Sequence, residues 1–410
     1  MPPMQPLWQS NRSGYKQKNR QTMLKNITSD VKYIGVDDTD LDLFESQYVI
    51  PNGMAYNSYL IEDEQIAVMD SVDARKCDEW IANLAEALGE RTPDYLIVQH
   101  MEPDHTGSIE MVMERYPNLK IVATARAVQM LPQFFEECNF EGRTLAVKEG
   151  ESLSLGRHTL QFFSAPMVHW PEVMVTYDAT DKILFSADGF GKFGALSHQE
   201  EWACEARRYY FNICGKYGAS VQALLKKAAM LDIEIIAPLH GPMLTENLNY
   251  YIGLYDTWSR YDVETEGIFI ACASIYGGTL EAAEKLADIL RANGAPKVSV
   301  ADLSRDDMAE AVEDAFRMDR LVVAAASYDG GVFPPMHDFL HHLQIKGYQR
   351  RRVGIIENGS WAPCSGRVMR EMLSQMKQIE IVEPMVTLWS RMKKADVAAL
   401  EALADALLAK

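Results

Sequence analysis

Two patterns of apolar and polar residues divide the 410-residue chain into two parts. Up to about residue 261, short apolar runs typical of strands mix with helical periodicity, most clearly in an amphipathic segment over residues 76–88. From residue 268 onward, five apolar runs alternate strictly with helical segments, and an Ala- and Leu-rich segment closes the chain. Such alternation predicts a doubly wound parallel sheet with helices on both faces.

The polar stretch around residue 263 separates the two parts and predicts the domain boundary. We expect a disordered N-terminal extension over residues 1–22, a first domain over 23–263 and a second over 264–410. Expected strands of the first domain are residues 48–51, 57–63, 65–71, 95–100, 119–125, 159–166, 173–178, 182–188 and 234–240. Those of the second are residues 268–274, 297–303, 320–327, 352–358 and 381–389.

Composition narrows the class of protein. The net charge of -18 argues against nucleic acid and against an anionic membrane as partners, because both bind basic surfaces. No apolar run approaches the ~20 residues of a membrane span, and the N-terminus has no signal-peptide pattern. The six cysteines are scattered without a C-x-x-C pair, which predicts reduced thiols in a cytoplasmic protein.

Potential metal ligands gather where the expected strands end. The strand over residues 95–100 runs into the sequence H-M-E-P-D-H, and three later strand ends carry a histidine or an aspartate. The full set is four histidines, two aspartates and one glutamate: His100, Glu102, Asp104, His105, His169, Asp188 and His240. A single histidine at a strand end is more often a hydrogen-bonded structural residue, but a cluster of this density favours a metal site.

The number and type of these side chains indicate two metal ions. Neutral imidazole binds iron, zinc or copper, and a carboxylate adds negative charge and can bridge two cations. Seven ligands are too many for one tetrahedral zinc. They suit a two-metal site with one bridging carboxylate and open coordination positions.

Glycine-rich loops follow three strands of the second domain. A Gly-rich turn between a strand and a helix lets backbone N–H groups approach a phosphate. Ligands of such sheets bind outside the carboxyl ends of the strands, where an aromatic side chain can stack on a flat ring. The candidate cofactor-binding residues are Ser274, Ile275, Tyr276, Gly277, Gly278, Thr279, Ser327, Tyr328, Asp329, Gly330, Gly331, Ser360 and Trp361.

The motif H-x-E-x-D-H, followed by His, Asp and His at strand ends, resembles that of the metallo-β-lactamase fold. In the hydrolases of that fold the third motif position is usually histidine and the metal is often zinc. This sequence has Glu102 at that position, and in this it resembles the flavodiiron proteins, whose metals are iron. An anionic oxygen ligand favours iron over zinc. The second domain resembles flavodoxin, although Pro363 and Cys364 depart from the usual pattern of its fourth loop.

The resemblance implies an αββα metallo-β-lactamase-like sandwich followed by a flavodoxin-like doubly wound sheet. It implies two iron ions per chain: one bound by His100, Glu102 and His169, the other by Asp104, His105 and His240, with Asp188 bridging. It further implies FMN, reduction of O2 to water or of NO to N2O, and rubredoxin or another separate electron donor. Head-to-tail homodimers, possibly tetramers, are expected. The choice between O2 and NO stays open.

Two other functions remain as alternatives at this point. The first domain could be a zinc-dependent hydrolase fused to a flavodoxin-like module, although Glu102 speaks against it. The chain could also be an electron carrier with a vestigial metal site, although the ligand set is complete.

Overall fold

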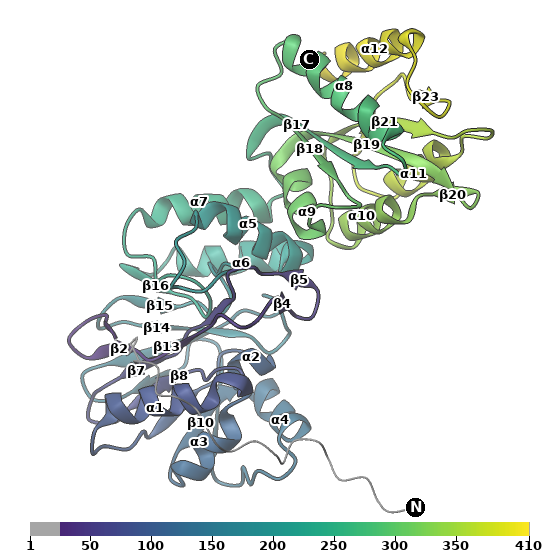
Figure 1. The fold of residues 1–410 in the computed structure, drawn as a ribbon. Helices are drawn as coiled ribbons and strands as arrows, with labels where there is room; N and C mark the ends of the chain where they lie inside the picture. The colour runs from purple at the N-terminus through teal and green to yellow at the C-terminus, as the bar shows by residue number, and fades with distance from the viewer. Residues whose placement is uncertain (1–24, 410) are drawn as a thin grey trace, which may run out of the picture.

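The computed structural model describes residues 25–409, so the extension expected over residues 1–22 lies outside the described residues. The described chain folds into two α/β units stacked end to end (Figure 1). Within this part of the chain, no helix has both the length and the apolar character needed to cross a bilayer.

Two sheets form the centre of the first unit. One has the order β1-β2-β7-β8-β9-β10-β11 and the other the order β12-β13-β14-β15-β16. Their facing sides bury side chains such as Tyr59, Ile97, Phe162 and Phe185. The first sheet comprises β1 (Lys25–Asn26), β2 (Val31–Tyr33), β7 (Tyr59–Ile61), β8 (Ala67–Met69), β9 (Tyr95–Ile97), β10 (Lys120–Thr124) and β11 (Thr144–Val147). The second comprises β12 (Ser152–Ser154), β13 (Thr159–Ser164), β14 (Met174–Asp178), β15 (Ile183–Phe185) and β16 (Ile235–Ala237).

Helices cover the outer faces of both sheets, which gives the expected αββα layering. The helix predicted over residues 76–88 is α1 (Cys77–Leu88), which buries Trp80 and Leu84 one turn apart. It ends at Gly89, whose φ of 59° is readily adopted only without a Cβ. On the first sheet α1 is joined by α3 (Ile109–Arg115) and α4 (Ala125–Phe134); on the second lie α5 (Trp202–Ile213), α6 (Gly218–Ala228) and α7 (Leu248–Ser259).

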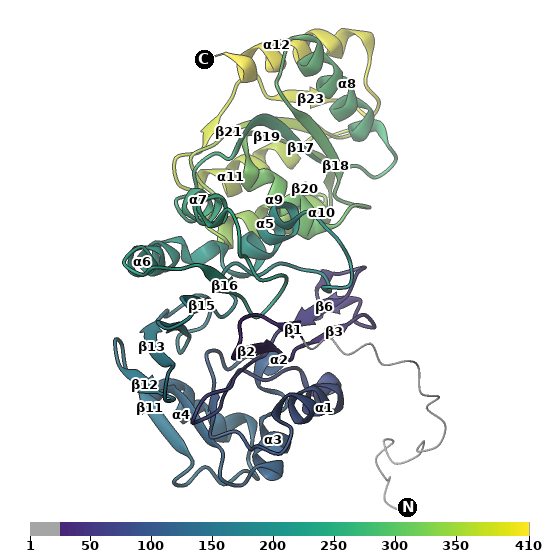
Figure 2. The ribbon, with the colours of Figure 1, turned by 90° about the vertical axis from the view of Figure 1, so that its left-hand side faces the viewer.

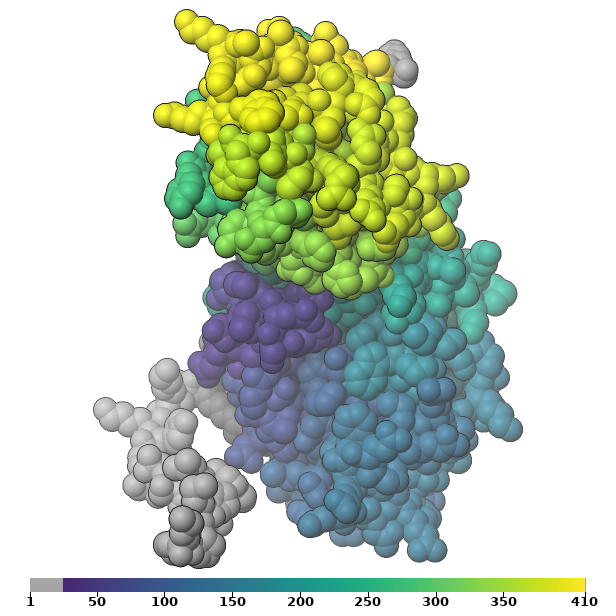
Figure 3. All heavy atoms as spheres, turned by 90° about the vertical axis from the view of Figure 1, so that its right-hand side faces the viewer, coloured from purple at the N-terminus to yellow at the C-terminus, as the bar shows by residue number. Residues whose placement is uncertain are grey.

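Two small antiparallel pairs lie between the sheets and the second unit. One joins β3 (Val36–Asp38) to β6 (Met54–Tyr56), and the other joins β4 (Leu43–Phe44) to β5 (Tyr48–Val49). Strand β5 is shorter than the strand expected over residues 48–51. In the space-filling view, the N-terminal segment drawn in purple lies directly below the second unit (Figure 3).

The second unit is the doubly wound parallel sheet that the alternating pattern predicts. Its strand order is β18-β17-β19-β21-β22, with β23 also pairing β21 in parallel. Two helices, α8 and α12, pack on one face, and three, α9, α10 and α11, pack on the other. The strands are β17 (Thr265–Ala273), β18 (Val298–Asp302), β19 (Met318–Tyr328), β20 (Gly331–Val332), β21 (Arg352–Asn358), β22 (Glu380–Ile381) and β23 (Val386–Leu388). The helices are α8 (Gly278–Ala292), α9 (Met308–Arg317), α10 (Pro334–Ile345), α11 (Ser365–Ser374) and α12 (Val397–Leu408).

The expectation of a single strand over residues 381–389 is wrong. The segment forms two short strands, β22 and β23, that both pair with β21. Pro384 lies between them, and because proline has no N–H it cannot donate to a sheet ladder.

The two units meet along α5 and α9 (Figure 2). The rings of Phe211 and Phe316 stack across this junction with centroids 4.3 Å apart. Arg207 adds a buried ion pair of 2.8 Å to Glu313. One apolar core therefore runs through the outer helices of the first unit into the second.

Candidate metal centre and glycine-rich loops

All seven predicted metal ligands converge at one edge of the first unit. They come from loops that follow strands, and α2 (Pro103–Thr106) turns the H-M-E-P-D-H segment inward with Pro103 at its first position. The side chains form two groups whose ligand atoms lie within 4.8 Å of one another. The first group is His100, Glu102, His169 and Asp188; the second is Asp104, His105 and His240.

In the first group, the imidazole Nε2 atoms and carboxylate oxygens face a common point. The Nε2 atoms of His100 and His169 lie 3.2 Å apart. Oε2 of Glu102 lies 2.9 Å from Nε2 of His169 and 3.2 Å from Nε2 of His100. Ligand atoms about 2.1 Å from one metal ion lie about 3.0–3.4 Å from each other in tetrahedral or octahedral geometry. The observed distances fit that expectation.

Asp188 connects the two groups through its two carboxylate oxygens. Its Oδ2 lies 3.1 Å from Nε2 of His169 in the first group, and its Oδ1 lies 3.0 Å from Nε2 of His105 in the second. Asp104 and His240 complete the second group, with Oδ2 and Nε2 3.2 Å apart. One oxygen facing each group is the geometry of a carboxylate that bridges two cations.

The polar atoms of this centre are buried without the partners that burial normally requires. Both carboxylate oxygens of Asp104 and of Asp188, together with Nε2 of His240, have no hydrogen bond of good geometry. Buried carboxylates are rarely left unpaired, because desolvation of the charge is costly. Cations bound between these atoms would satisfy them, so the residues fit a pair of metal ions.

The pKa values of the centre are shifted because carboxylates are held beside imidazoles. Burial lowers the pKa of His169, but the neighbouring carboxylates of Asp188 and Glu102 outweigh it and raise this pKa to about 9. Burial raises the pKa of Asp188, yet the charges of His105 and His100 bring it well below its usual range. A centre that attracts protons this strongly also attracts metal cations.

Two acceptors orient the imidazoles from behind. Oε1 of Glu172 lies 2.9 Å from Nδ1 of His100 and also accepts a hydrogen bond from the backbone N–H of Met101. Nδ1 of His240 donates to the carbonyl of Ala55 at 2.8 Å. A hydrogen bond at Nδ1 leaves Nε2 unprotonated and directed at the metal position. Glu172 lies three residues after His169, but no sequence pattern predicted it as part of the site.

A pocket of about 500 Å³ opens onto the centre. Glu102, Pro103 and Asp104 form part of its wall, and the β4–β5 hairpin forms another part. Phe44 of the hairpin packs edge-on against the ring of His240, with centroids 5.5 Å apart. The pocket is thus a route by which a small molecule reaches the metal centre.

The predicted glycine-rich loops meet at the carboxyl edge of the second sheet. Nδ2 of Asn358 at the end of β21 donates to Oγ1 of Thr279 and to the carbonyl of Ser390, which ties three loops together. Gly277 has a φ of 85°, and a Cβ there would meet no atom within 4 Å. The Oγ of Ser274 is buried without a partner, so this loop has both the space and a free hydroxyl for a phosphate.

Large aromatic side chains are exposed around these loops. Tyr276 is 98% exposed, Trp361 87% and Tyr328 46%, a concentration that marks a binding site rather than ordinary surface. By contrast, the Oγ of Ser327 accepts hydrogen bonds from the N–H groups of Cys364 and Ser365, so it serves the loop itself.

Trp389, which the sequence predicted only as the end of a strand, joins this aromatic group. It follows β23 and is 52% exposed. The next residue, Ser390, lies so close to Gly278 that a Cβ added to this glycine would be 2.9 Å from the Ser390 carbonyl oxygen. The loop after the fifth strand therefore packs directly on the first glycine-rich loop. The rule that ligands bind at the carboxyl ends of parallel strands, applied to this strand as well, would have found it.

Comparisons with known proteins agree with this fold. A family model described as "ODP family beta lactamase" matches residues 54–241. A putative diflavin flavoprotein A 2 of Synechocystis sp. is 30% identical over 85% of this chain and 61% of its own length. An anaerobic nitric oxide reductase flavorubredoxin of Vibrio vulnificus is 27% identical over 83% of this chain and 70% of its own length.

Among solved structures, the rubredoxin oxygen:oxidoreductase of Desulfovibrio gigas has the same fold. It matches with a TM-score of 0.87 and 24% identity, covering 94% of this chain and 97% of that one. The chain spans about three fifths of the length of the diflavin flavoprotein it matches, 61%.

The fold and the site define a class: a metallo-β-lactamase-like domain with two groups of side chains that could hold metal ions, followed by a flavodoxin-like domain. The sequence relatives add a similarity to diflavin flavoproteins and flavorubredoxins.

Proposed function

We propose that this chain is a flavodiiron oxidoreductase that reduces O2 to water, NO to N2O, or both, with electrons passed through FMN. One observation carries the proposal: two groups of buried ligand atoms share Asp188 and include the anionic Glu102. The names of the relatives support both gases, because one is called a nitric oxide reductase and another an oxygen oxidoreductase.

The proposed metals are two iron ions per chain. His100, Glu102 and His169 would hold one ion, and Asp104, His105 and His240 would hold the other, with Asp188 between them. Three carboxylates among seven ligands make a harder and more anionic set than the histidine-rich sites typical of zinc, which favours iron.

The proposed flavin site is the exposed edge of the second sheet. Residues 274–279 would bind the phosphate through backbone N–H groups and the free hydroxyl of Ser274, while Tyr328 or Trp361 would stack on the ring. When bound, FMN supplies electrons one at a time and the irons supply Lewis acidity and redox capacity.

The chain's own residues set the conditions for this chemistry. Asp188 holds the two metal positions close together, and Glu172 keeps Nε2 of His100 aimed at the first. The pocket beside Glu102 admits a small substrate, and the burial of the other ligands restricts water. A dry, fixed donor set makes each electrostatic contact stronger than it would be in water.

Assembly and partners extend the proposal. We expect a head-to-tail homodimer, possibly a tetramer, in which the exposed aromatic loops of one chain cover the metal pocket of the other. Rubredoxin or another separate protein would reduce the flavin, in the cytoplasm. The functional units would be residues 23–263 for the metals and 264–410 for FMN, with residues 1–22 as an extension; β17 begins at Thr265.

Steady-state consumption of O2 and of NO tests this function directly. Protein loaded with iron and FMN is reduced chemically, and each gas is followed separately, with an Asp188→Ala variant as the inactive control. Rapid consumption of at least one gas by the wild type alone is expected. If the loaded wild-type protein consumes neither gas, the proposal is wrong.

The same preparation distinguishes the alternatives. Two zinc ions per chain with thioester hydrolysis would establish the hydrolase, which Glu102 and the relatives disfavour. An Asp188→Ala variant with full gas consumption would establish that the metal centre is vestigial. Rapid turnover by a protein that sedimentation shows to be a monomer would refute the dimer.

A further inference from the structure

The β4–β5 hairpin places an additional carboxylate, Glu45, in the pocket beside the metal centre. Glu45 lies at the hairpin turn and lines the same pocket as Glu102 and Asp104. Among the described residues, its carboxylate accepts one hydrogen bond, from Nε2 of Gln47 at 3.1 Å. It is solvent-accessible and is in no ion pair with any residue of the described range 25–409, so it can exchange protons with water.

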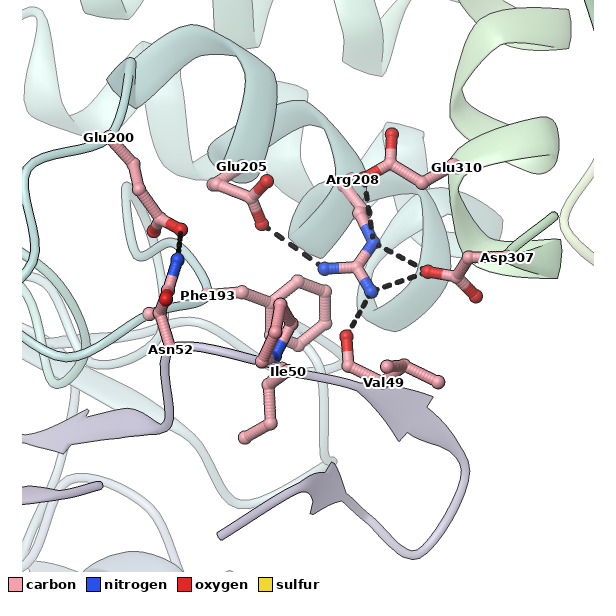
Figure 4. A pocket seen from close by; sticks show the side chains of 11 residues that line it. Val49, Ile50, Asn52, Phe193, Glu200, Glu205, Arg208, Asp307 and Glu310 are labelled. Carbon is pink, nitrogen blue, oxygen red and sulfur yellow. Dashed lines mark hydrogen bonds and ion pairs between the residues drawn. The ribbon is translucent and has the colours of Figure 1, made fainter. Parts of the chain in front are cut away.

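The hairpin that carries Glu45 is anchored firmly on both of its sides. Phe44 packs on the ring of the ligand His240, and the hydroxyl of Tyr48 donates to the carbonyl of Asn212 at 3.1 Å. On the outer side, Arg208 donates to the carbonyl of Val49 (Figure 4). The turn therefore has a defined position over the pocket.

The Arg208 anchor also ties the hairpin to the second unit. Arg208 pairs with Asp307 at the start of α9 at 2.6 Å and lies over the ring of Phe193, 4.8 Å from its centroid (Figure 4). Asp307 accepts from N–H of Ala309 and caps that helix. The turn with Glu45 is thus fixed relative to both units.

The other pocket carboxylates are less suited to proton exchange. Glu102 and Asp104 belong to the proposed ligand set. Asp73 is held in an ion pair with Arg75, from Oδ1 to Nε at 2.9 Å. Asp42 also lines the pocket wall. Glu45 is the pocket acid outside the ligand set on which the charges of Glu102, His169 and Asp104 act.

We propose that Glu45 is a proton-relay residue that passes protons from solvent through the pocket to the substrate. The proposal rests on the proposed function. Reduction of one O2 to two waters consumes four electrons and four protons, and conversion of two NO to N2O and water consumes two of each. The external donor supplies the electrons. The O–H bond of protonated Glu45 breaks, the proton passes to a reduced oxygen of the substrate, and solvent returns a proton to the carboxylate.

The surroundings of Glu45 suit this task. Partial enclosure by the pocket walls raises the pKa of Glu45 above its usual range. An acid whose pKa lies near the working pH is the most effective proton carrier. Bound metal cations oppose this shift, so reduction of the centre, which lowers its positive charge, would favour proton uptake. The titratable groups around Glu45 are Glu102, Asp104, His169, Tyr48, Lys346 and Cys214.

Kinetics of Glu45→Gln in the fully loaded enzyme test the relay. We expect kcat to fall at least about tenfold, near the lower end for general acid catalysis because water can partly substitute. KM for the gas should not change, and the solvent deuterium isotope effect should rise as proton delivery becomes limiting. Glu45→Asp should recover part of kcat. Asp42→Asn, which removes an equal charge from the same pocket, should leave kcat and the isotope effect unchanged.

A second measurement reads the proton without turnover. The infrared difference spectrum between the reduced and oxidised holoenzyme should show the band of a protonated carboxylic acid, shifted in D2O and absent in Glu45→Gln. The relay is refuted if Glu45→Gln, with full iron and FMN, keeps the wild-type kcat and isotope effect at every pH. It is also refuted if the band is missing in the wild type. If wild-type protein consumes neither gas, the proposed function fails, and the infrared band still decides whether Glu45 exchanges a proton.

Discussion

Replacement of Glu172 tests whether iron binding depends on the acceptor behind His100. Oε1 of Glu172 accepts hydrogen bonds of 2.9 Å from both Nδ1 of His100 and the N–H of Met101, and its side chain is fully buried. Glu172→Ala removes both bonds and leaves two buried donors unpaired. Glu172→Gln keeps an acceptor oxygen but loses the charge, and puts an NH2 group where Oε2 is buried without a partner.

The magnitude follows from these contacts. Loss of a partner behind a metal-binding histidine lowers metal affinity by about 10- to 100-fold, which is about 1.4–2.7 kcal/mol. We expect the smaller loss for Glu172→Gln and the larger for Glu172→Ala. Each unpaired buried donor costs about 1–3 kcal/mol, so metal-free Glu172→Ala, with two such donors, should also lose about 2–6 kcal/mol of unfolding free energy.

A chemically similar pair elsewhere in the domain provides the control. Nδ1 of His158 lies 2.8 Å from Oδ2 of Asp178, and both side chains are buried. Met174 begins β14 beside the metal centre, where its N–H donates to the carbonyl of Gln99. Asp178 ends the same strand, about 13 Å farther from the centre. Asp178→Asn should therefore lower stability without changing iron affinity.

Competition with a chelator under anaerobic conditions measures iron affinity, and denaturant unfolding of the metal-free protein measures stability. Wild-type iron affinity in Glu172→Ala would refute the reasoning. An equal loss of affinity in Asp178→Asn would also refute it, because general destabilisation would then explain both.

Three further predictions concern other parts of the molecule. Asp188→Asn should bind fewer than two irons and lose gas consumption, because a neutral amide bridges two cations poorly; full iron content by metal analysis would contradict this. Gly278→Ala should weaken FMN binding about tenfold, measured by flavin fluorescence, because its Cβ would lie 2.9 Å from the carbonyl of Ser390; unchanged binding would show that the loop yields. Burial lowers the pKa of Lys346 from 10.5 to about 8. Between pH 8 and pH 10.5 the unfolded state therefore binds more protons than the folded state, and the free energy of unfolding should rise with pH by up to about 3 kcal/mol. Denaturant titrations should show this rise in the wild type and not in Lys346→Met, and a rise in both would exclude Lys346 as its source.

Local patterns in the sequence were sufficient for the fold class and for the residues at strand ends. Strict alternation of strands and helices after residue 268 predicted the parallel sheet, which the strand order confirms. The seven candidate ligands could be selected because each follows a buried strand, and such ends collect at one edge of a sheet. Their division into two groups was implied by the resemblance, and the structure arranges them in the same two groups around Asp188.

Features that depend on contacts between distant segments were not predictable in this way. The break between β22 and β23 was missed, although Pro384 was a visible signal for it. Trp389 was read only as the end of a strand, because its role depends on the packing of Ser390 against Gly278.

The sequence by itself determined which side chains can bind metal and phosphate, because that chemistry depends on residue type and on position at a strand end. Tertiary structure alone decided what surrounds them. Glu172 reaches His100 across 72 residues of chain, and the hairpin brings Glu45 to a pocket formed by Glu102. No local periodicity encodes such pairings, since they arise only when two sheets and the second unit pack together.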